Sequence, residues 1–289
     1  MAQSLLTLYN IALVDVLVQK QGSIMQKYKL SVFALGAAFA VLVAPALAED
    51  TQATTASPVS YNFGLVSDYV FRGITQTTHN PALQGGLDYE HNTGLYVGAW
   101  ASNVRWIKDS GAIATGDANV ELDTYFGIKN AVAIDYGYDF GYVRYNYLGT
   151  YTPQIGSINA DTTEVYGAAS YKFVTLKYSY SLLDGFLTNP GAKGTNYLDL
   201  SANYPVEDVG MTVGAHIGKQ TIVGAAADSA AFSPSSGYTD YKLSASKDFN
   251  SYVLSLSYTN TKGATSSFWN PGGDQWGRSS TALSLIHQF

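Results

Sequence analysis

The feature of this sequence that most restricts its fold is an alternation of apolar and polar residues that recurs along most of the chain. In the segment 119–129, Leu122 and Phe126 share one face, whereas Glu121 and Asp123 share the other. A period of two residues is typical of β-strands that have one apolar face. We therefore predict twelve strands, over residues 61–72, 82–90, 94–103, 119–129, 133–147, 163–172, 173–182, 195–204, 209–218, 238–247, 251–260 and 280–289.

The connections between these segments are alternately short and long. The short ones lie near residues 91, 130 and 172 and at 205–208 and 248–250. The long, polar ones cover residues 104–118, 148–162, 183–194, 219–237 and 261–279, while the first connection, 73–81, is intermediate. Short turns at one end and long loops at the other are typical of outer-membrane barrels. Because every backbone polar group needs a partner within hydrocarbon, strands span a membrane only as a closed sheet. We therefore predict an all-β fold, a transmembrane antiparallel up-and-down β-barrel of twelve strands, over residues 61–289.

The composition agrees with this prediction. Charged residues make up 13% of the chain, about half of their usual share in a soluble domain. Tyr and Phe number 23 and 12 and suit the two aromatic girdles of a membrane barrel. A soluble β-sandwich is the alternative, but it needs no such rhythm of loops. The net charge of −6 argues against nucleic-acid binding, and the absence of Cys excludes disulfides and thiolate metal sites.

Residues 25–48 resemble a secretion signal. A positively charged start, an apolar stretch over 30–44 and the sequence Ala-Leu-Ala predict cleavage between Ala48 and Glu49. The alternative for this stretch is an uncleaved membrane anchor. Residues 1–24 precede a complete signal, so we expect that translation starts at Met25 and that the upstream leader is an annotation error. Residues 49–60 are small and polar, and we expect a flexible periplasmic segment.

One predicted strand, 133–147, changes phase along its length. Tyr138 and Phe140 share one apolar face, whereas Val143 and Tyr145 have the opposite phase. We expect a β-bulge near Gly141, because a bulge shifts the phase by one residue and often contains glycine.

The charged residues opposite the apolar faces are candidates for the barrel lumen. The acidic candidates are Asp68, Asp88, Glu90, Glu121, Asp123, Asp135, Asp139, Glu164, Asp199 and Asp240, and the basic ones are Arg72, Lys129, Arg144, Lys172, Lys177 and Lys242. An excess of carboxylates around a water-filled lumen favours cations. The alternative is that opposite charges pair across a filled barrel and block it. On one predicted strand, Arg72 lies about 13 Å from Asp68, so we expect it to pair with Asp88 or Glu90 on the next strand.

No catalytic or metal site is predicted, and no cofactor is expected. The sequence contains four His but no G-x-S-x-G motif and no His spacing typical of metal sites. The last residue, Phe289, ends an amphipathic strand and is predicted to be a signal for the barrel-assembly machinery.

Residues 64–77, GLVSDYVFRGITQT, resemble the opening strand of the TorF family of proteobacterial porins. The matching residues are Ser67, Asp68, Tyr69, Phe71, Arg72, Gly73, Thr75, Gln76 and Thr77. The resemblance implies an outer-membrane barrel that acts as a porin. Such a protein would contact outer-membrane lipid and lipopolysaccharide, and during its assembly periplasmic chaperones.

Together these observations predict a narrow, mildly cation-preferring channel for small hydrophilic solutes, into which a long loop such as 219–237 could fold. The alternatives are a non-conducting barrel that acts as a surface scaffold or adhesin, and, more remotely, a membrane-embedded hydrolase.

Overall fold

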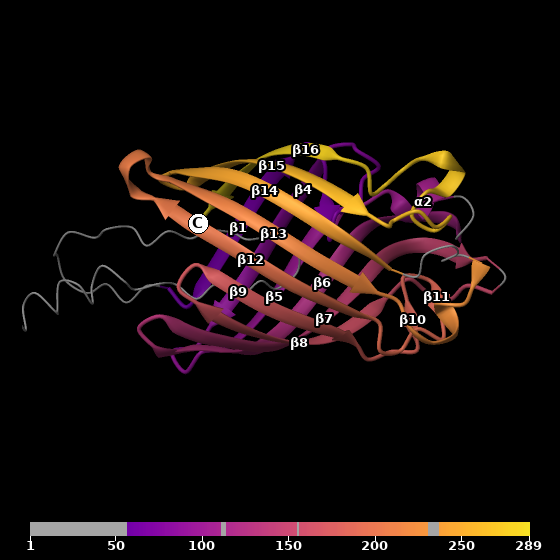
Figure 1. The fold of residues 1–289 in the computed structure, drawn as a ribbon, viewed down its shortest axis with the longest axis horizontal. Helices are drawn as coiled ribbons and strands as arrows, with labels where there is room; N and C mark the ends of the chain where they lie inside the picture. The colour runs from indigo at the N-terminus through magenta and orange to yellow at the C-terminus, as the bar shows by residue number, and fades with distance from the viewer. Residues whose placement is uncertain (1–56, 111–113, 155, 231–236) are drawn as a thin grey trace, which may run out of the picture.

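The computed structural model describes residues 57–110, 114–154, 156–230 and 237–289. Twelve strands within these ranges form one closed antiparallel barrel (Figure 1). They are β1 (Val59–Val66), β4 (Ala82–Glu90), β5 (Leu95–Asn103), β6 (Ala114–Ala133), β7 (Tyr136–Pro153), β8 (Thr162–Tyr171), β9 (Val174–Ser181), β12 (Asn196–Val206), β13 (Met211–Thr221), β14 (Gly237–Phe249), β15 (Tyr252–Lys262) and β16 (Ser280–Gln288). Each strand pairs with its neighbour along the chain, and β1 pairs with β16 to close the sheet. The barrel therefore has no exposed edge strand.

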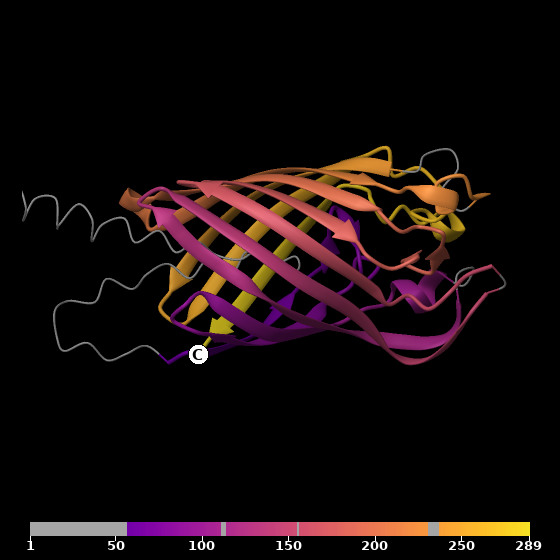
Figure 2. The ribbon, with the colours of Figure 1, turned by 90° about the horizontal axis from the view of Figure 1, so that it is seen from below.

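The two ends of the barrel differ, as the sequence predicts. Figures 1 and 2 show strands that run obliquely around the barrel, with the C-terminus at one end and long loops at the other. We call these the turn end and the loop end. The remaining elements belong to the long connections that leave the wall at the loop end, except for the 3-10 helix η1 (Glu207–Val209), which lies in a turn. These elements are β2 (Val70–Phe71), β3 (Ile74–Thr75), α2 (Trp106–Ser110), β10 (Gly185–Phe186), β11 (Asn189–Pro190), η2 (Gly224–Ala226) and η4 (Pro271–Gly273).

The outer surface of the wall is apolar over the middle of the barrel. Side chains such as Leu87, Phe126 and Leu243 point outward and are more than half exposed, at 54%, 57% and 63%. Their neighbours along each strand point inward, because successive side chains of a strand alternate between the two faces. No helix in the described part of the chain is long and apolar enough to cross a membrane.

A belt of aromatic side chains surrounds the turn end. It consists of the exposed residues Tyr61, Tyr89, Tyr136, Tyr171, Phe173, Tyr204, Phe249, Tyr252 and Phe289. Several of them contact each other around the rim, for example Tyr136 and Tyr171, whose ring centroids are 4.7 Å apart. Phe289 stacks on Tyr61 at 4.9 Å, across the seam where β16 meets β1. The aromatic residues thus form a girdle at this end.

Two strands are longer than the alternation predicts. β6 and β7 remain paired as far as Ala114 and Pro153, so parts of the predicted loops 104–118 and 148–162 are strand. The ladder between β6 and β7 has irregularities between Ala118 and Val120 and between Ala131 and Ala133. The expected bulge near Gly141 is wrong, because Gly141 is in continuous register with both neighbouring strands. Val143 and Tyr145 follow the opposite phase because they point into the barrel, where they are buried.

The first predicted strand, 61–72, is too long. β1 ends at Val66, and Ser67 makes the last backbone contact with β16, donating to the Leu283 carbonyl at 2.9 Å. The chain then turns into the barrel and returns to the wall at Ala82. The upstream leader, the signal peptide with its cleavage site between Ala48 and Glu49, and most of the segment 49–60 lie outside the described residues.

Glycine is required where inward side chains cross. A Cβ atom at Gly141 would overlap the ring and hydroxyl of Tyr166 and lie 2.7 Å from the Tyr96 hydroxyl. We therefore expect Gly141→Ala to destabilise the barrel by about 1–3 kcal/mol. The matched control is Gly85→Ala, whose Cβ would have no neighbour closer than 3.2 Å. Urea unfolding of both variants, followed by heat-modifiable gel mobility, checks this, and equal midpoints would contradict it.

Candidate functional site

The barrel interior contains a segment of its own chain. Residues 67–81, which we call the inner hairpin, connect β1 to β4 and carry the short strands β2 and β3. The turn between these strands consists of Arg72 and Gly73, whose φ angles are 47° and 77°. A two-residue hairpin turn needs this left-handed conformation, which glycine adopts freely and arginine only at a cost of about 1 kcal/mol. The side chain of Arg72, not its backbone preference, therefore accounts for its place at the tip.

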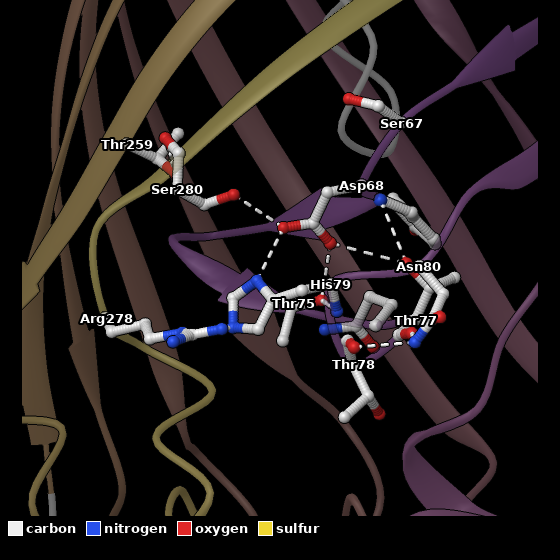
Figure 3. A network of polar contacts seen from close by, with 12 residues as sticks. Ser67, Asp68, Thr75, Thr77, Thr78, His79, Asn80, Thr259, Arg278 and Ser280 are labelled. Atoms are coloured by element: carbon white, nitrogen blue, oxygen red, sulfur yellow. Dashed lines mark hydrogen bonds and ion pairs between the residues drawn. The ribbon is translucent and has the colours of Figure 1, made fainter.

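The base of the inner hairpin is fastened by a buried carboxylate, Asp68 (Figure 3). It accepts hydrogen bonds from the hydroxyls of Thr75 at 2.5 Å, Ser280 at 2.6 Å and Thr77 at 3.3 Å. His79 Nδ1 lies 2.8 Å from the same carboxylate. Because Ser280 belongs to β16, Asp68 ties the hairpin both to itself and to the barrel wall.

The proton position on His79 follows from its second partner. Arg278 Nε donates to His79 Nε2 at 3.0 Å, so this nitrogen is the acceptor. Nδ1 must therefore carry the proton and donate it to Asp68, which makes the ring neutral. The same contact connects the hairpin to the long loop that precedes β16 (Figure 3).

The tip is held by a buried ion pair with β8. Arg72 Nη2 donates to Glu164 Oε2 at 2.6 Å, and Nη1 donates to Glu164 Oε1 at 3.0 Å, so the ion pair is bidentate. The two side chains are only 8% and 2% exposed. Nη1 also donates to Gln220 Oε1 on β13 at 3.2 Å. The guanidinium lies over the rings of Tyr197 and Phe71, at 4.4 and 4.7 Å from their centroids. These contacts fix the tip against two separate parts of the wall.

Apolar side chains from the loops pack inside the barrel between the inner hairpin and the loop end. Trp106 on α2 packs edge-on against Tyr147 with ring centroids 5.1 Å apart. The hairpin backbone joins this layer, because Thr75 N donates to the Trp276 carbonyl at 3.0 Å and Arg105 N donates to the Gln76 carbonyl at 2.8 Å. Within the described residues, the loop end is thus filled by the hairpin and the loops around it.

A cavity of about 130 Å³ remains beside the hairpin tip, on its turn side. It is lined by side chains of both charges from the wall and by the tip itself. Its charged lining residues are Arg72, Lys177, Asp199, His216, Asp240 and Lys242. The cavity therefore combines charged groups with apolar side chains, and it is large enough for a few water molecules or a small solute.

His216 lies at this cavity between two carboxylates. Its Nδ1 is 2.7 Å from Asp199 Oδ2, and its Nε2 is 2.8 Å from Asp240 Oδ1. Each nitrogen satisfies its carboxylate only as a donor, so the ring is a charged imidazolium. The Ser201 hydroxyl lies 3.1 Å from His216 Nδ1, but it donates to Asp199 Oδ1 at 2.7 Å. A serine nucleophile needs a histidine nitrogen that can accept its proton, and this cluster offers none.

Further pairs follow the inner wall toward the turn end. Lys129 Nζ on β6 lies 2.7 Å from Glu90 Oε2 on β4, across the intervening strand β5. The Tyr125 hydroxyl donates to Asp88 at 2.6 Å. The Tyr96 hydroxyl donates to Asp139 at 2.7 Å and also contacts the Tyr166 hydroxyl. The interior is therefore a network of paired charges and tyrosine hydroxyls.

Most of the predicted lumenal residues point into the barrel. On the wall these are Asp88, Glu90, Glu121, Asp123, Lys129, Asp139, Glu164, Lys177, Asp199, Asp240 and Lys242. Asp68 and Arg72 also lie inside, but on the inner hairpin and not on a wall strand. Their role in lining a pore stays a prediction.

Three predicted lumenal residues lie elsewhere. Asp135 and Lys172 belong to adjacent turns, where Lys172 N donates to the Asp135 carbonyl at 2.8 Å, and Lys172 is exposed with a φ of 52°. Arg144 points outward because β7 contains no bulge at Gly141, and it pairs with Asp161 at 3.1 Å. The expected pairing of Arg72 with Asp88 or Glu90 is also wrong, since the tip reaches Glu164.

The sequence reasoning missed several interior residues. His216 and Gln220 occupy inward positions of β13, and a search of the polar face of that strand would have found both. The interior tyrosines carried no such signal, because tyrosine is equally suited to the outer girdle. They are Tyr69, Tyr96, Tyr125, Tyr145, Tyr147, Tyr166, Tyr197 and Tyr238. In the described ranges, no group of three or more His, Asp or Glu side chains is arranged to hold a metal ion.

Comparison with known proteins assigns a family. The profile of a family described as "Bacterial protein of unknown function (Gcw_chp)" matches residues 50–289. The chain belongs to this family. No curated protein matches the sequence.

Solved structures similar to this Gcw_chp barrel include the KdgM porin, with a TM-score of 0.46 and 7% identity over 80% of this chain and 97% of that one. The NanC porin has a TM-score of 0.48 and 8% identity over 80% and 98% of the two chains. OprD of Pseudomonas aeruginosa has a TM-score of 0.37 and 13% identity over 80% and 66%. The match to the Gcw_chp family does not name TorF, so the TorF resemblance stays a prediction.

The buried ion pair at the hairpin tip leads to a stability prediction. Glu164→Gln leaves the Arg72 guanidinium buried without its counter-charge, so we expect a loss of about 3–5 kcal/mol. Replacing both residues with Met should recover most of that loss. The matched control is Glu90→Gln, whose side chain is 52% exposed and whose pair should contribute less than about 1 kcal/mol. Urea unfolding followed by Trp fluorescence measures all three, and similar losses for Glu164→Gln and Glu90→Gln would refute the prediction.

Proposed function

We propose that this Gcw_chp protein is a channel of the bacterial outer membrane for small hydrophilic solutes or ions, with the inner hairpin as its constriction. The single observation that carries the proposal is the reversal of polarity across one closed wall. Apolar side chains cover the outside and charged ones the inside, the arrangement of a membrane barrel that encloses a polar lumen. An aliphatic band exposed to water would be unfavourable, whereas lipid accommodates it at no cost.

The aromatic girdle supports the same placement. Tyrosine and phenylalanine rings concentrate at the headgroup level of membranes, and here they surround the turn end. In this orientation the turns face the periplasm and the loops face lipopolysaccharide and the exterior. The sequence features of a cleaved signal peptide, and Phe289 as an assembly signal, agree with export and insertion by the barrel-assembly machinery. Nothing in the described interior supports an enzyme mechanism, and we propose none.

The inward charges favour cations. Asp135, Arg144 and Lys172 do not point inward, so nine acidic and four basic predicted residues remain inside. The His216 imidazolium raises the number of inward positive charges to five, and the acidic groups still outnumber the basic ones. Carboxylates in a narrow, low-dielectric wall raise the local concentration of cations. The TorF resemblance agrees with a porin but does not bear on this preference.

The experiment is single-channel recording of the refolded protein in a planar bilayer under a salt gradient. We expect small conductance steps and a reversal potential that shows cation preference. At the turn-side mouth, Asp88→Asn combined with Glu90→Gln should shift the reversal potential toward anions. The matched control is Lys219→Gln, an exposed residue on the outer face. An anion preference of the wild type would overturn the cation assignment.

The placement in lipid has a separate test. Leu243 lies at the middle of β14 and is 63% exposed, so Leu243→Arg should reduce the free energy of unfolding in bilayers by about 2–4 kcal/mol. Val132 is 68% exposed near the turn end, where the same change should cost less than about 1 kcal/mol. Urea titrations in phospholipid vesicles compare the two variants. Equal and small losses would show that the band does not face lipid.

A closed barrel that serves as a surface scaffold is the second candidate. The hairpin fastened to the wall by Asp68 and Arg72, and the loops packed around it, favour this candidate. A folded barrel, identified by its heat-modifiable mobility, that passes no current in wild-type and variant forms would replace the channel with this function.

A further inference from the structure

The guanidinium of Arg72 is bound in the way that a protein binds a ligand. Glu164, Gln220 and Tyr197 provide a carboxylate, an amide oxygen and an aromatic face, at 2.6 Å, 3.2 Å and 4.4 Å respectively. All three belong to wall strands, β8, β13 and β12, and only the Phe71 ring comes with the hairpin. The wall therefore holds a site for a planar cation whose geometry does not depend on the hairpin backbone.

The geometry selects a guanidinium group over a simple ammonium. Both oxygens of Glu164 accept from separate nitrogens of Arg72, a pairing that requires the planar fork of a guanidinium. The central carbon of the same group lies over the Tyr197 ring, 4.4 Å from its centroid, and a guanidinium is suited to such a contact because it can also stack on an aromatic face. An ammonium could make only one of these contacts well at a time.

A further buried carboxyl group, that of Asp123, belongs to the same part of the interior as the Arg72–Glu164 pair. Asp123 points into the barrel, is fully buried at 0% exposure, and has no hydrogen-bond partner for either carboxylate oxygen within the described structure. It faces Tyr145 across the β6–β7 ladder, while Glu164 faces Val143 across the β7–β8 ladder, so the two carboxylates flank the same part of β7. Burial without a partner disfavours the charged form of a carboxyl group, so Asp123 adds a polar group to this part of the interior and not a fixed negative charge.

The site also has room for the rest of a small solute. The cavity of about 130 Å³ is lined by Arg72, Tyr145 and Tyr197, among other residues. Asp199 and Asp240 on its lining offer additional acceptors, although His216 already lies between them. A solute with a guanidinium head and a short tail would fit with its head at Glu164.

We propose that Glu164, Gln220 and Tyr197 form a binding site for solutes that carry a guanidinium group, and that Arg72 occupies this site in the closed barrel. A solute of this class takes the place of the Arg72 side chain and releases the hairpin tip from the wall. If the barrel is a channel, displacement of Arg72 would open it to the same class of solute, and this part of the inference rests on the proposed function. Binding itself does not require that the barrel conducts.

The test uses Arg72→Ala, which empties the site, and methylguanidinium chloride as the probe, with methylammonium chloride at equal concentration as the control. We expect 10 mM methylguanidinium to raise the unfolding temperature of Arg72→Ala by about 3 °C more than methylammonium does. The double variant Arg72→Ala with Glu164→Gln should respond equally to both salts. If Arg72→Ala does not refold, the experiment uses Arg72→Gln instead, because this variant keeps the side-chain stem and removes the charge.

The outcomes separate the two proposals. A selective response in Arg72→Ala that disappears with Glu164→Gln supports the site, and an equal response of the single and double variants overturns it. Equal effects of the two salts on Arg72→Ala overturn the guanidinium class. In planar bilayers, Arg72→Ala should conduct more than wild type, and methylguanidinium should reduce that current. Selective stabilisation without any current refutes the channel and keeps the site, whereas current without selective stabilisation refutes the site and keeps the channel.

Discussion

The whole structure depends on the requirement that the backbone groups of the wall find partners within the sheet. The pairing of β1 with β16 meets this requirement by joining the two ends of the barrel sequence. Once the sheet is closed, each wall side chain has only two environments, outside or inside. Strand parity therefore decides which side chains face outward and which face inward. Most of the charged ones face inward, where Arg72 and Asp68 of the inner hairpin contact them or the wall.

The barrel was predictable from the sequence because its wall is determined by local alternation and by loop lengths. The inward or outward direction of most charged side chains followed from the same rule. Tyrosine occurs on both faces: Tyr136 faces outward in the girdle, while Tyr145, at a position of opposite parity on the same strand, faces inward against the hairpin. A ring with a hydroxyl suits both places, so its direction was read wrongly beyond Gly141.

The inner hairpin could not be predicted, because the interactions that draw it inward join distant parts of the chain. Asp68 meets Ser280 across 212 residues, and Arg72 meets Glu164 across 92. Residues 67–72 alternate well enough to continue the first strand, and nothing nearby in the sequence shows that they leave it. The candidate site exists only once closure brings β8, β12 and β13 around that tip.

The inner hairpin joins the wall at both ends, at Val66 and Ala82, so its tip never diffuses away. A free solute that competes with Arg72 therefore faces an intramolecular rival whose effective concentration is in the millimolar range. The barrel would then respond to high concentrations of the solute and not to trace concentrations. The length of the inner hairpin, which tethers Arg72, would thus set the solute concentration needed to displace it. The affinity of the site for a guanidinium group would stay the same.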